Sequence, residues 1–282
     1  MVSSKPDLDR VVGTALEEDL GERDIDITTQ NVIDSEILGE ARVVARCRGV
    51  LSGGDAAARV FDMVRPSCIY VALVPDGTLV DGGDEVARVT GSLSSILTGE
   101  RTALNFLQRM SGIATLTRRY VDALAPFPKV TLLDTRKTTP GLRFLERAAV
   151  RAGGGHNHRD GLWDAILIKD NHVAAAGGVA IAVARARKAG KPIEVEVDTL
   201  EQLAEALAAG AEIVLLDNMP TEQMREAVEI TAGRAQLEAS GGMTLDGAVA
   251  AARAGVDRIS VGALTHSAPA LDLSLEVVKT WR

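Results

Sequence analysis

Short apolar runs that alternate with helical segments limit most strongly how this chain can fold. From about residue 129 onward six runs of five residues recur, at 130–134, 164–168, 193–197, 213–217, 235–239 and 258–262. Runs of this length are too short for buried helices and suit strands buried on both faces of a parallel sheet. The last four runs start 20 to 23 residues apart, a spacing that favours a (β/α) barrel over a doubly wound sheet. No GxGxxG motif opens a helix, which argues against dinucleotide binding.

The segments between the last runs carry signals for the start and end of a helix. A threonine that caps the first turn is followed, after the helix, by a glycine. The expected pairs are Thr199 and Gly210, Thr221 and Gly233, and Thr244 and Gly255. These signals predict a helix after each of three strands.

The first part of the chain has a different pattern. Residues 41–47 and 69–73 read as strands, and 75–91 reads as hairpins, which together predict a small α+β domain. Residues 97–124 read as helical, with Gly112 expected to divide them into two helices. We therefore expect an α+β domain with its linking helix at 1–115, a barrel domain at 116–270, and a C-terminal segment at 271–282 that returns to the first domain.

The composition fits a folded protein of 282 residues with 46% hydrophobic and 25% charged residues. The net charge of −8 argues against general binding to nucleic acid or anionic lipid. Cys47 and Cys68 have no CxxC spacing, and no signal peptide or membrane span is evident, so we expect a soluble cytoplasmic protein.

Basic residues nevertheless gather between Asp134 and Asp170, which indicates a pocket for a small, multiply anionic ligand. For the helically spaced residues near 143–151, a solvated helix face explains the pattern equally well. The gathered residues are Arg136, Lys137, Arg143, Arg147, Arg151, Arg159 and Lys169, with His156 and His158 among them.

Charged residues also recur where the predicted strands end, which is where α/β barrels place their active sites. The strand at 193–197 alternates, so that Glu194, Glu196 and Asp198 share one face and point toward the lumen. Glu196 and Asp217 end adjacent strands and offer the hard oxygen ligands that magnesium accepts when a substrate phosphate completes its shell. A histidine metal site is not favoured, and His156 and His158 beside Arg159 suit carboxylate recognition.

The last two strands run into glycine-containing loops. Ser240, Gly241 and Gly242 follow one strand, and Gly262 to His266 follow the other. Glycines let backbone amides approach an anion, and the helix capped by Thr244 directs its positive end toward the same place. Two such loops after the final strands predict a phosphate site.

The chain resembles the quinolinate phosphoribosyltransferases along almost its whole length. The similar segments are Leu97 to Asn105, Asp134 to Arg143, Gly153 to Arg159, Leu167 to His172, Glu194 to Asp198, Leu215 to Asn218, Ser240 to Gly242 and Val261 to His266. One departure is Ala239, where relatives often have a second serine. The resemblance implies an open-faced sandwich domain at the N-terminus, an incomplete (β/α) barrel, and a homodimer with its active sites at the interface.

The resemblance also implies an activity and a set of residues. Quinolinate and phosphoribosyl pyrophosphate would give nicotinate mononucleotide, pyrophosphate and CO2, in NAD biosynthesis, with Mg2+ delivered by phosphoribosyl pyrophosphate. Glu196 and Asp217 would hold the metal and the ribose, with Lys137 and Lys169 also catalytic. The substrate-binding residues would be Arg101 of the partner subunit, Arg136, His158, Arg159, Lys169, Ser240, Gly241, Gly262 and His266.

Three alternatives remain open at this point. A paralogue on the same scaffold would use another ring acid, as in the relatives associated with molybdenum transport. A Schiff-base lyase would use Lys169 as its nucleophile, since neighbouring cations lower the pKa of a lysine. A sensor of phosphorylated sugars would bind without catalysis.

Overall fold

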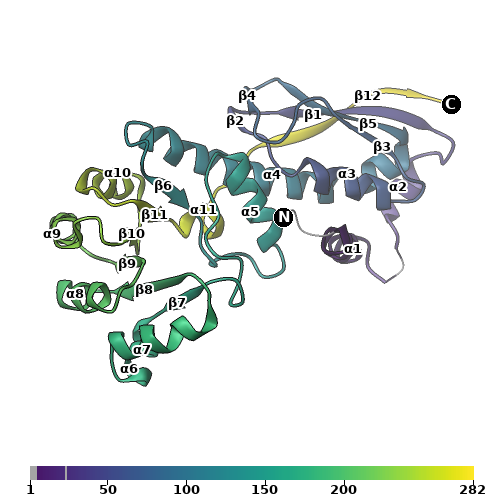
Figure 1. The fold of residues 1–282 in the computed structure, drawn as a ribbon. Helices are drawn as coiled ribbons and strands as arrows, with labels where there is room; N and C mark the ends of the chain where they lie inside the picture. Colours follow the sequence, from purple (N-terminus) through teal and green to yellow (C-terminus); the bar gives the residue numbers. More distant parts are fainter. Residues whose placement is uncertain (1–4, 23) are drawn as a thin grey trace. The chain divides into compact units, whose positions relative to one another are not determined.

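The computed structural model describes residues 5–22 and 24–282, which form two compact units (Figure 1). The first unit comprises Met1–Arg118, Thr139–Gly154 and Ala268–Arg282, and the second comprises Arg119–Thr138 and Gly155–Ser267. The main difference from the expected boundaries is 139–154, which groups with the first unit. The reason is a buried contact: Arg109 lies 2.9 Å from the carboxylate of Glu146, which is fully buried.

The first unit contains the helices and strands up to the long fourth helix, together with the fifth helix and the last strand of the chain. They are α1 (Lys5–Leu20), α2 (Ile27–Val32), β1 (Leu38–Ala45), β2 (Gly49–Val50), α3 (Gly54–Met63), β3 (Ile69–Ala72), β4 (Leu79–Val80), β5 (Glu85–Ser92), most of α4 (Leu93–Leu124), α5 (Arg143–Ala152) and β12 (Leu273–Trp281). The strands at 41–47 and 69–73 are thereby confirmed.

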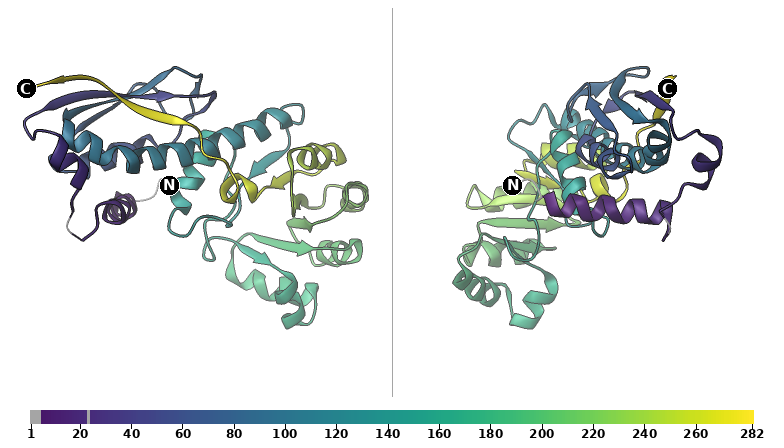
Figure 2. Two further views of the ribbon diagram at one scale, coloured as in Figure 1. Left: turned by 180° about the vertical axis from the view of Figure 1, so that it is seen from behind. Right: turned by 90° about the vertical axis from the view of Figure 1, so that its right-hand side faces the viewer.

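An antiparallel sheet in the order β12-β1-β5-β3 forms the frame of this unit. Figures 1 and 2 show α3 and α4 on one face of the sheet, and the other face is open. Side chains follow this division: Val43 is buried, while its neighbour Arg42 is exposed and pairs with Glu276 across the open face. The first unit is therefore an open-faced sandwich, closed at one edge by the last strand of the chain.

Helix α4 is continuous over 32 residues, so the expectation that Gly112 divides it was wrong. A Cβ atom at Gly112 would lie 2.1 Å from the carbonyl oxygen of Pro269. The glycine lets the chain before β12 approach the helix closely, and the stabilisation from that packing outweighs the low helix propensity of glycine, about 1 kcal/mol.

The second unit is built on a parallel sheet in the order β6-β11-β10-β9-β8-β7. Its elements are β6 (Thr131–Leu133), β7 (Ile166–Ile168), α6 (Asp170–Ala176), α7 (Val179–Ala186), a 3-10 turn (Arg187–Ala189), β8 (Ile193–Val197), α8 (Leu200–Ala208), β9 (Ile213–Asp217), α9 (Thr221–Thr231), β10 (Gln236–Ser240), α10 (Leu245–Ala254), β11 (Arg258–Ser260) and α11 (Ala263–His266). All six predicted strands are present.

This sheet is an incomplete barrel, as predicted. Helices α7 to α10 lie on its outer side (Figures 1 and 2). β6 and β7 are the two edges and do not pair with each other. A single bridge from Leu133 to His156 extends the β6 edge instead.

Two of the three predicted helix caps are confirmed. The Thr199 and Thr244 side chains accept hydrogen bonds from the backbone N–H groups of Gln202 and Gly247. Thr221 is not a cap, because Pro220 occupies that position with extended backbone and Thr221 is already helical. Among the described residues, no helix has the length and apolar character to cross a membrane.

Candidate active site

The register of the parallel strands brings a set of polar side chains onto one face of the sheet. Glu196 lies beside Leu215, Ser240 beside Asp217, and Glu238 beside Arg258. Residues that pair in a parallel sheet point to the same face, and so does every second residue along each strand. The polar residues on this lumen face include Glu194, Glu196, Asp217, Glu238, Ser240, Arg258 and Ser260.

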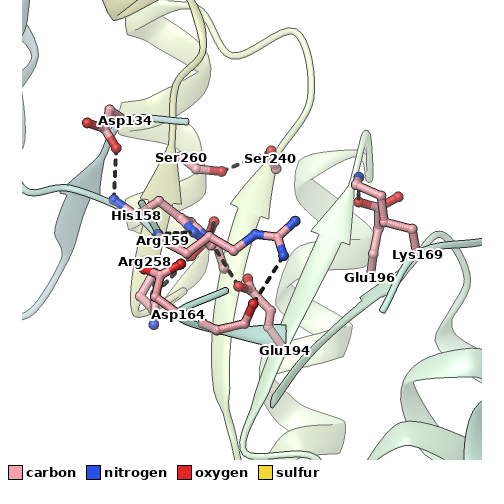
Figure 3. Close-up of polar contacts among 12 residues, drawn as sticks. Asp134, His158, Arg159, Asp164, Lys169, Glu194, Glu196, Ser240, Arg258 and Ser260 are labelled. Carbon is pink, nitrogen blue, oxygen red and sulfur yellow. Dashed lines mark hydrogen bonds and ion pairs between the residues drawn. The ribbon is translucent and has the colours of Figure 1, made fainter. Parts of the chain in front are cut away.

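Asp134 fixes the segment that carries His158 and Arg159 (Figure 3). It follows β6, is fully buried, and accepts a 2.8 Å hydrogen bond from the backbone N–H of His158. The Asn157 side chain donates to its other oxygen. The guanidinium of Arg159 donates to the carbonyl oxygen of Ala165 at 3.1 Å, so backbone contacts hold this cation in place.

Arg136 and Arg159 lie close enough for their charges to repel each other. Burial lowers the pKa of Arg159, repulsion by Arg136 lowers it further, and Glu194 and Asp164 oppose these effects. The Nε atom of Arg136 is buried and makes no hydrogen bond within the described part of the chain. Two adjacent guanidinium groups with a buried unused donor are suited to binding an anion.

Lys169 and Glu196 are in direct contact between β7 and β8. The Lys169 side chain is 46% exposed, so the site lacks the apolar burial that would turn a lysine into a nucleophile. This environment disfavours a Schiff-base lyase. The contact with Glu196 holds the Lys169 ammonium group beside the end of β8.

Glu196 and Asp217 fit a magnesium site by their chemistry and their place. They lie on neighbouring strands and on the same face, two residues apart in register, and both are half-buried. Asp217 also accepts a 3.0 Å hydrogen bond from the Asn218 side chain. Two partly exposed carboxylates leave coordination positions for water and phosphate, as magnesium requires.

The two glycine-containing loops are shaped by close approaches. A Cβ atom at Gly241, where φ is +95°, would lie 2.2 Å from the Asn218 side chain. At Gly262 it would lie 3.0 Å from Lys137 and 3.1 Å from His266. The structure thus brings Gly262, Lys137 and His266 together. The Ser240 and Ser260 hydroxyls are hydrogen-bonded at 2.9 Å between β10 and β11.

His158 lies deeper than expected, among carboxylates. Its Nε2 is 2.9 Å from Glu194 and 3.4 Å from Glu238, and Arg258 donates to the other oxygen of Glu238 at 2.8 Å. Burial acts against protonation, but the two carboxylates outweigh it and raise the pKa of His158 to about 9. Oxygens of Glu194 and Glu238 and a ring nitrogen of His158 also have the mutual spacing of metal ligands. Arg258 nevertheless already neutralises Glu238, so we interpret the group as an ion-pair network.

Glu238 and Arg258 were missed as site residues. The sequence could have indicated them. Each is a charged residue inside a short apolar strand, two positions away from a residue that faces the lumen, so it faces the lumen as well.

The remaining predicted cations are not in the second unit. Arg101 is exposed on α4 in the first unit. Arg143, Arg147 and Arg151 lie on α5, also in the first unit. Arg147 is only 6% exposed, so a solvated helix face does not describe it.

Known proteins resemble this chain over nearly its full length. Profiles described as "Quinolinate phosphoribosyl transferase, N-terminal domain" and "C-terminal domain" match residues 26–111 and 113–276. A "Probable nicotinate-nucleotide pyrophosphorylase [carboxylating]" of Bacillus subtilis is 43% identical, covering 92% of this chain and 90% of the relative. The corresponding Mycobacterium leprae enzyme is 46% identical, covering 93% and 94%. A solved structure of the Francisella tularensis nicotinate-nucleotide pyrophosphorylase superimposes with a TM-score of 0.93 at 43% identity, covering 98% of each chain. The chain belongs to the quinolinate phosphoribosyl transferase family.

Proposed function

We propose that this protein transfers a phosphoribosyl group from phosphoribosyl pyrophosphate to quinolinate and releases pyrophosphate and CO2, forming nicotinate mononucleotide for NAD biosynthesis. The observation that carries the proposal is the pair Arg136 and Arg159, in which a buried guanidinium nitrogen has no partner among the described residues. Quinolinate brings two adjacent carboxylates on one ring. At an effective dielectric constant near 20, each unit charge pair 4 Å apart contributes about 4 kcal/mol, which offsets desolvation of a dianion only when several cations surround it.

Residues on the lumen face are suited to binding phosphoribosyl pyrophosphate, the second substrate. Ser240, Gly241 and Gly262 would bind the 5-phosphate, largely through backbone N–H groups, with Lys137 and His266 beside Gly262. Glu196 and Asp217 would hold Mg2+ together with the ribose hydroxyls. The metal would neutralise charge on the departing pyrophosphate.

The reaction then follows from charge placement. The ring nitrogen of quinolinate attacks the anomeric carbon as the bond to pyrophosphate breaks, and Glu196 and Asp217 stabilise the cation-like ribose of the transition state. The ring nitrogen becomes quaternary. When the adjacent carboxylate leaves as CO2, the electron pair stays on the ring carbon, where the positive charge of the neighbouring nitrogen stabilises it, and a proton then binds to that carbon. Lys169, at the lumen mouth, is placed to orient the leaving carboxylate.

The proposed assembly is a homodimer in which Arg101 of one subunit enters the active site of the other. Exposure of Arg101 on α4, with a charge suited to a dianion, supports this assignment together with the family resemblance. The protein is proposed to act in the cytoplasm.

The test is to incubate the protein with quinolinate, phosphoribosyl pyrophosphate and MgCl2 and to measure nicotinate mononucleotide and CO2. Nicotinate is the matched control, because it lacks the 2-carboxylate and leaves Arg136 or Arg159 uncompensated. We expect its turnover to be lower by at least 100-fold. Equal turnover of both acids, or no product from quinolinate, would refute the proposal. Turnover of a different ring acid in place of quinolinate would instead favour the paralogue.

A further inference from the structure

His158 is held by carboxylates from three separate places in the fold. Its Nε2 faces Glu194 of β8 and Glu238 of β10, and its backbone N–H is bound by Asp134 after β6. Arg258 of β11 fixes the far oxygen of Glu238. Glu194, Glu238 and Asp134 are almost completely buried, so their charges are poorly screened by solvent. The orientation of the imidazole ring is therefore set by the lumen.

The other side of the ring faces the backbone that carries Arg159. The backbone nitrogen of Arg159 lies 2.7 Å from Nδ1 of His158, so the ring and this backbone segment are in contact whichever charge the ring carries. The imidazole thus spans from two carboxylates at the centre of the sheet to the backbone amide of Arg159. A change in the ring's orientation would move that amide, and with it the Arg159 guanidinium.

Such a buried network has a substantial desolvation cost, and apolar residues of similar size would fill the same space more favourably. Its contribution is instead directional, because a hydrogen-bonded ion pair fixes a side chain more narrowly than apolar packing does. The network of Glu194, Glu238 and His158 thus connects the interior of the sheet to the proposed ring-acid site, which contains Arg136 and Arg159.

We propose that Glu194 and Glu238 are positioning residues for the ring acid, which act through His158 to fix the Arg159 segment. This inference deepens the proposed function and rests on it for its kinetic test. In this arrangement the two glutamates act on the substrate only through His158 and Arg159. Their removal should therefore weaken quinolinate binding and leave the sugar-phosphate side of the site unchanged.

The kinetic test uses Glu238→Gln and Glu194→Gln, which keep the side-chain shape and remove the charge. We expect the KM for quinolinate to rise about tenfold in each variant, equivalent to about 1.4 kcal/mol, while the KM for phosphoribosyl pyrophosphate stays within twofold. Glu212→Gln is the control, because Glu212 is exposed just before β9. In a His158→Gln background, Glu238→Gln should add no further effect, since its action passes through the imidazole.

A second readout does not depend on turnover. The chain has four histidines, so the ring nitrogen signals of His158 can be assigned by 15N NMR. In both variants we expect these signals and the Arg159 backbone amide signal to shift, while those of His156, His172 and His266 do not. If the His158 and Arg159 signals are unchanged, or if the KM effects of His158→Gln and Glu238→Gln are additive, the inference is wrong. Absence of any turnover by the wild type would refute the proposed function, and the NMR result would still decide the positioning role.

Discussion

The hydroxyl of Thr265 donates a 2.8 Å hydrogen bond to the backbone carbonyl of Lys137. Thr265 is fully buried in the short helix after β11, and Lys137 lies in the loop after β6. The bond joins two loops that come from distant parts of the sequence but from adjacent strands. One of these loops is proposed to bind phosphate, and the other carries a proposed catalytic lysine.

Thr265→Val should release the Lys137 loop while preserving the shape of the side chain. We expect a loss of about 1–2 kcal/mol in unfolding free energy, because a part-buried carbonyl loses its hydrogen bond. The KM for phosphoribosyl pyrophosphate should rise several-fold. Urea unfolding and steady-state kinetics measure the two effects. Thr231→Val is the control, since the buried Thr231 hydroxyl has no partner in the described structure. Equal behaviour of the two variants would contradict the role given to this bond.

Gly241→Ala should damage the proposed phosphate loop. The new methyl group would meet the Asn218 side chain at 2.2 Å, and the backbone φ of +95° is unfavourable for alanine. We expect a rise of at least tenfold in the KM for phosphoribosyl pyrophosphate and a smaller change for quinolinate. Gly233→Ala is a matched control, because its φ is +74° but its added Cβ meets nothing within 4 Å. A similar kinetic loss in both variants would point to general backbone strain.

The sequence predicted the architecture of the second unit well, because its signals are local. Strands 193–197 and 213–217 coincide with β8 and β9, since each is a β-rich apolar run bounded by turn residues. The Thr199 and Thr244 caps were recognisable for the same reason. Alternation in β8 also predicted correctly that Glu194 and Glu196 share a face.

Features that depend on contacts between distant segments were not predictable in this way. The continuity of α4 through Gly112 depends on Pro269, which is 157 residues further along the chain. The pairing of Glu238 with Arg258 depends on a register that only the assembled sheet defines. His158 was assigned to carboxylate recognition from its neighbours in sequence, which gave no sign that Glu194 and Glu238 surround its ring.

Stability should fall as pH rises through the alkaline range. His158 is raised from an ordinary pKa of 6.5 to about 9 in the folded protein. A pKa raised by folding gives stability that is fully present below pH 6.5 and is lost as pH rises through 9. The shift corresponds to at most about 3–4 kcal/mol, and the contact between Arg159 N–H and Nδ1, which favours the neutral ring, reduces this stabilisation. Urea unfolding at pH 6 and pH 9.5 should show the loss, and His158→Gln should abolish it. His156→Gln, at an exposed histidine, should retain it. If the unfolding free energy of His158→Gln depends on pH as in the wild type, His158 is not the source of the pH dependence.

Asp217→Asn should impair magnesium-dependent turnover far more than folding. Asp217 is half-buried at the end of β9 and has one described hydrogen bond, from Asn218, so its contribution to the core is small. We expect kcat/KM to fall at least 100-fold and the magnesium concentration for half-maximal rate to rise, with unfolding free energy changed by less than about 1 kcal/mol. Removal of magnesium with EDTA should abolish wild-type turnover. Full activity of the variant at low magnesium would exclude Asp217 as a metal ligand.

Arg101 and Lys169 should complement each other between subunits. Arg101 lies in the first unit and Lys169 in the second, and the proposed dimer combines Arg101 of one subunit with Lys169 of the other in a single active site. Arg101→Ala and Lys169→Ala should each be nearly inactive alone, because each loses a cation required by a dianionic ligand. In a mixed dimer, one site then carries both substitutions and the other carries neither.

Random equal mixing makes half of the dimers mixed, so activity should recover to roughly a quarter of the wild-type value. Native mass spectrometry verifies exchange, and a mixture of Arg101→Ala with Arg101→Ala/Lys169→Ala, which cannot form an intact site, is the control. If exchange occurs without recovery, Arg101 acts in its own subunit or outside the site.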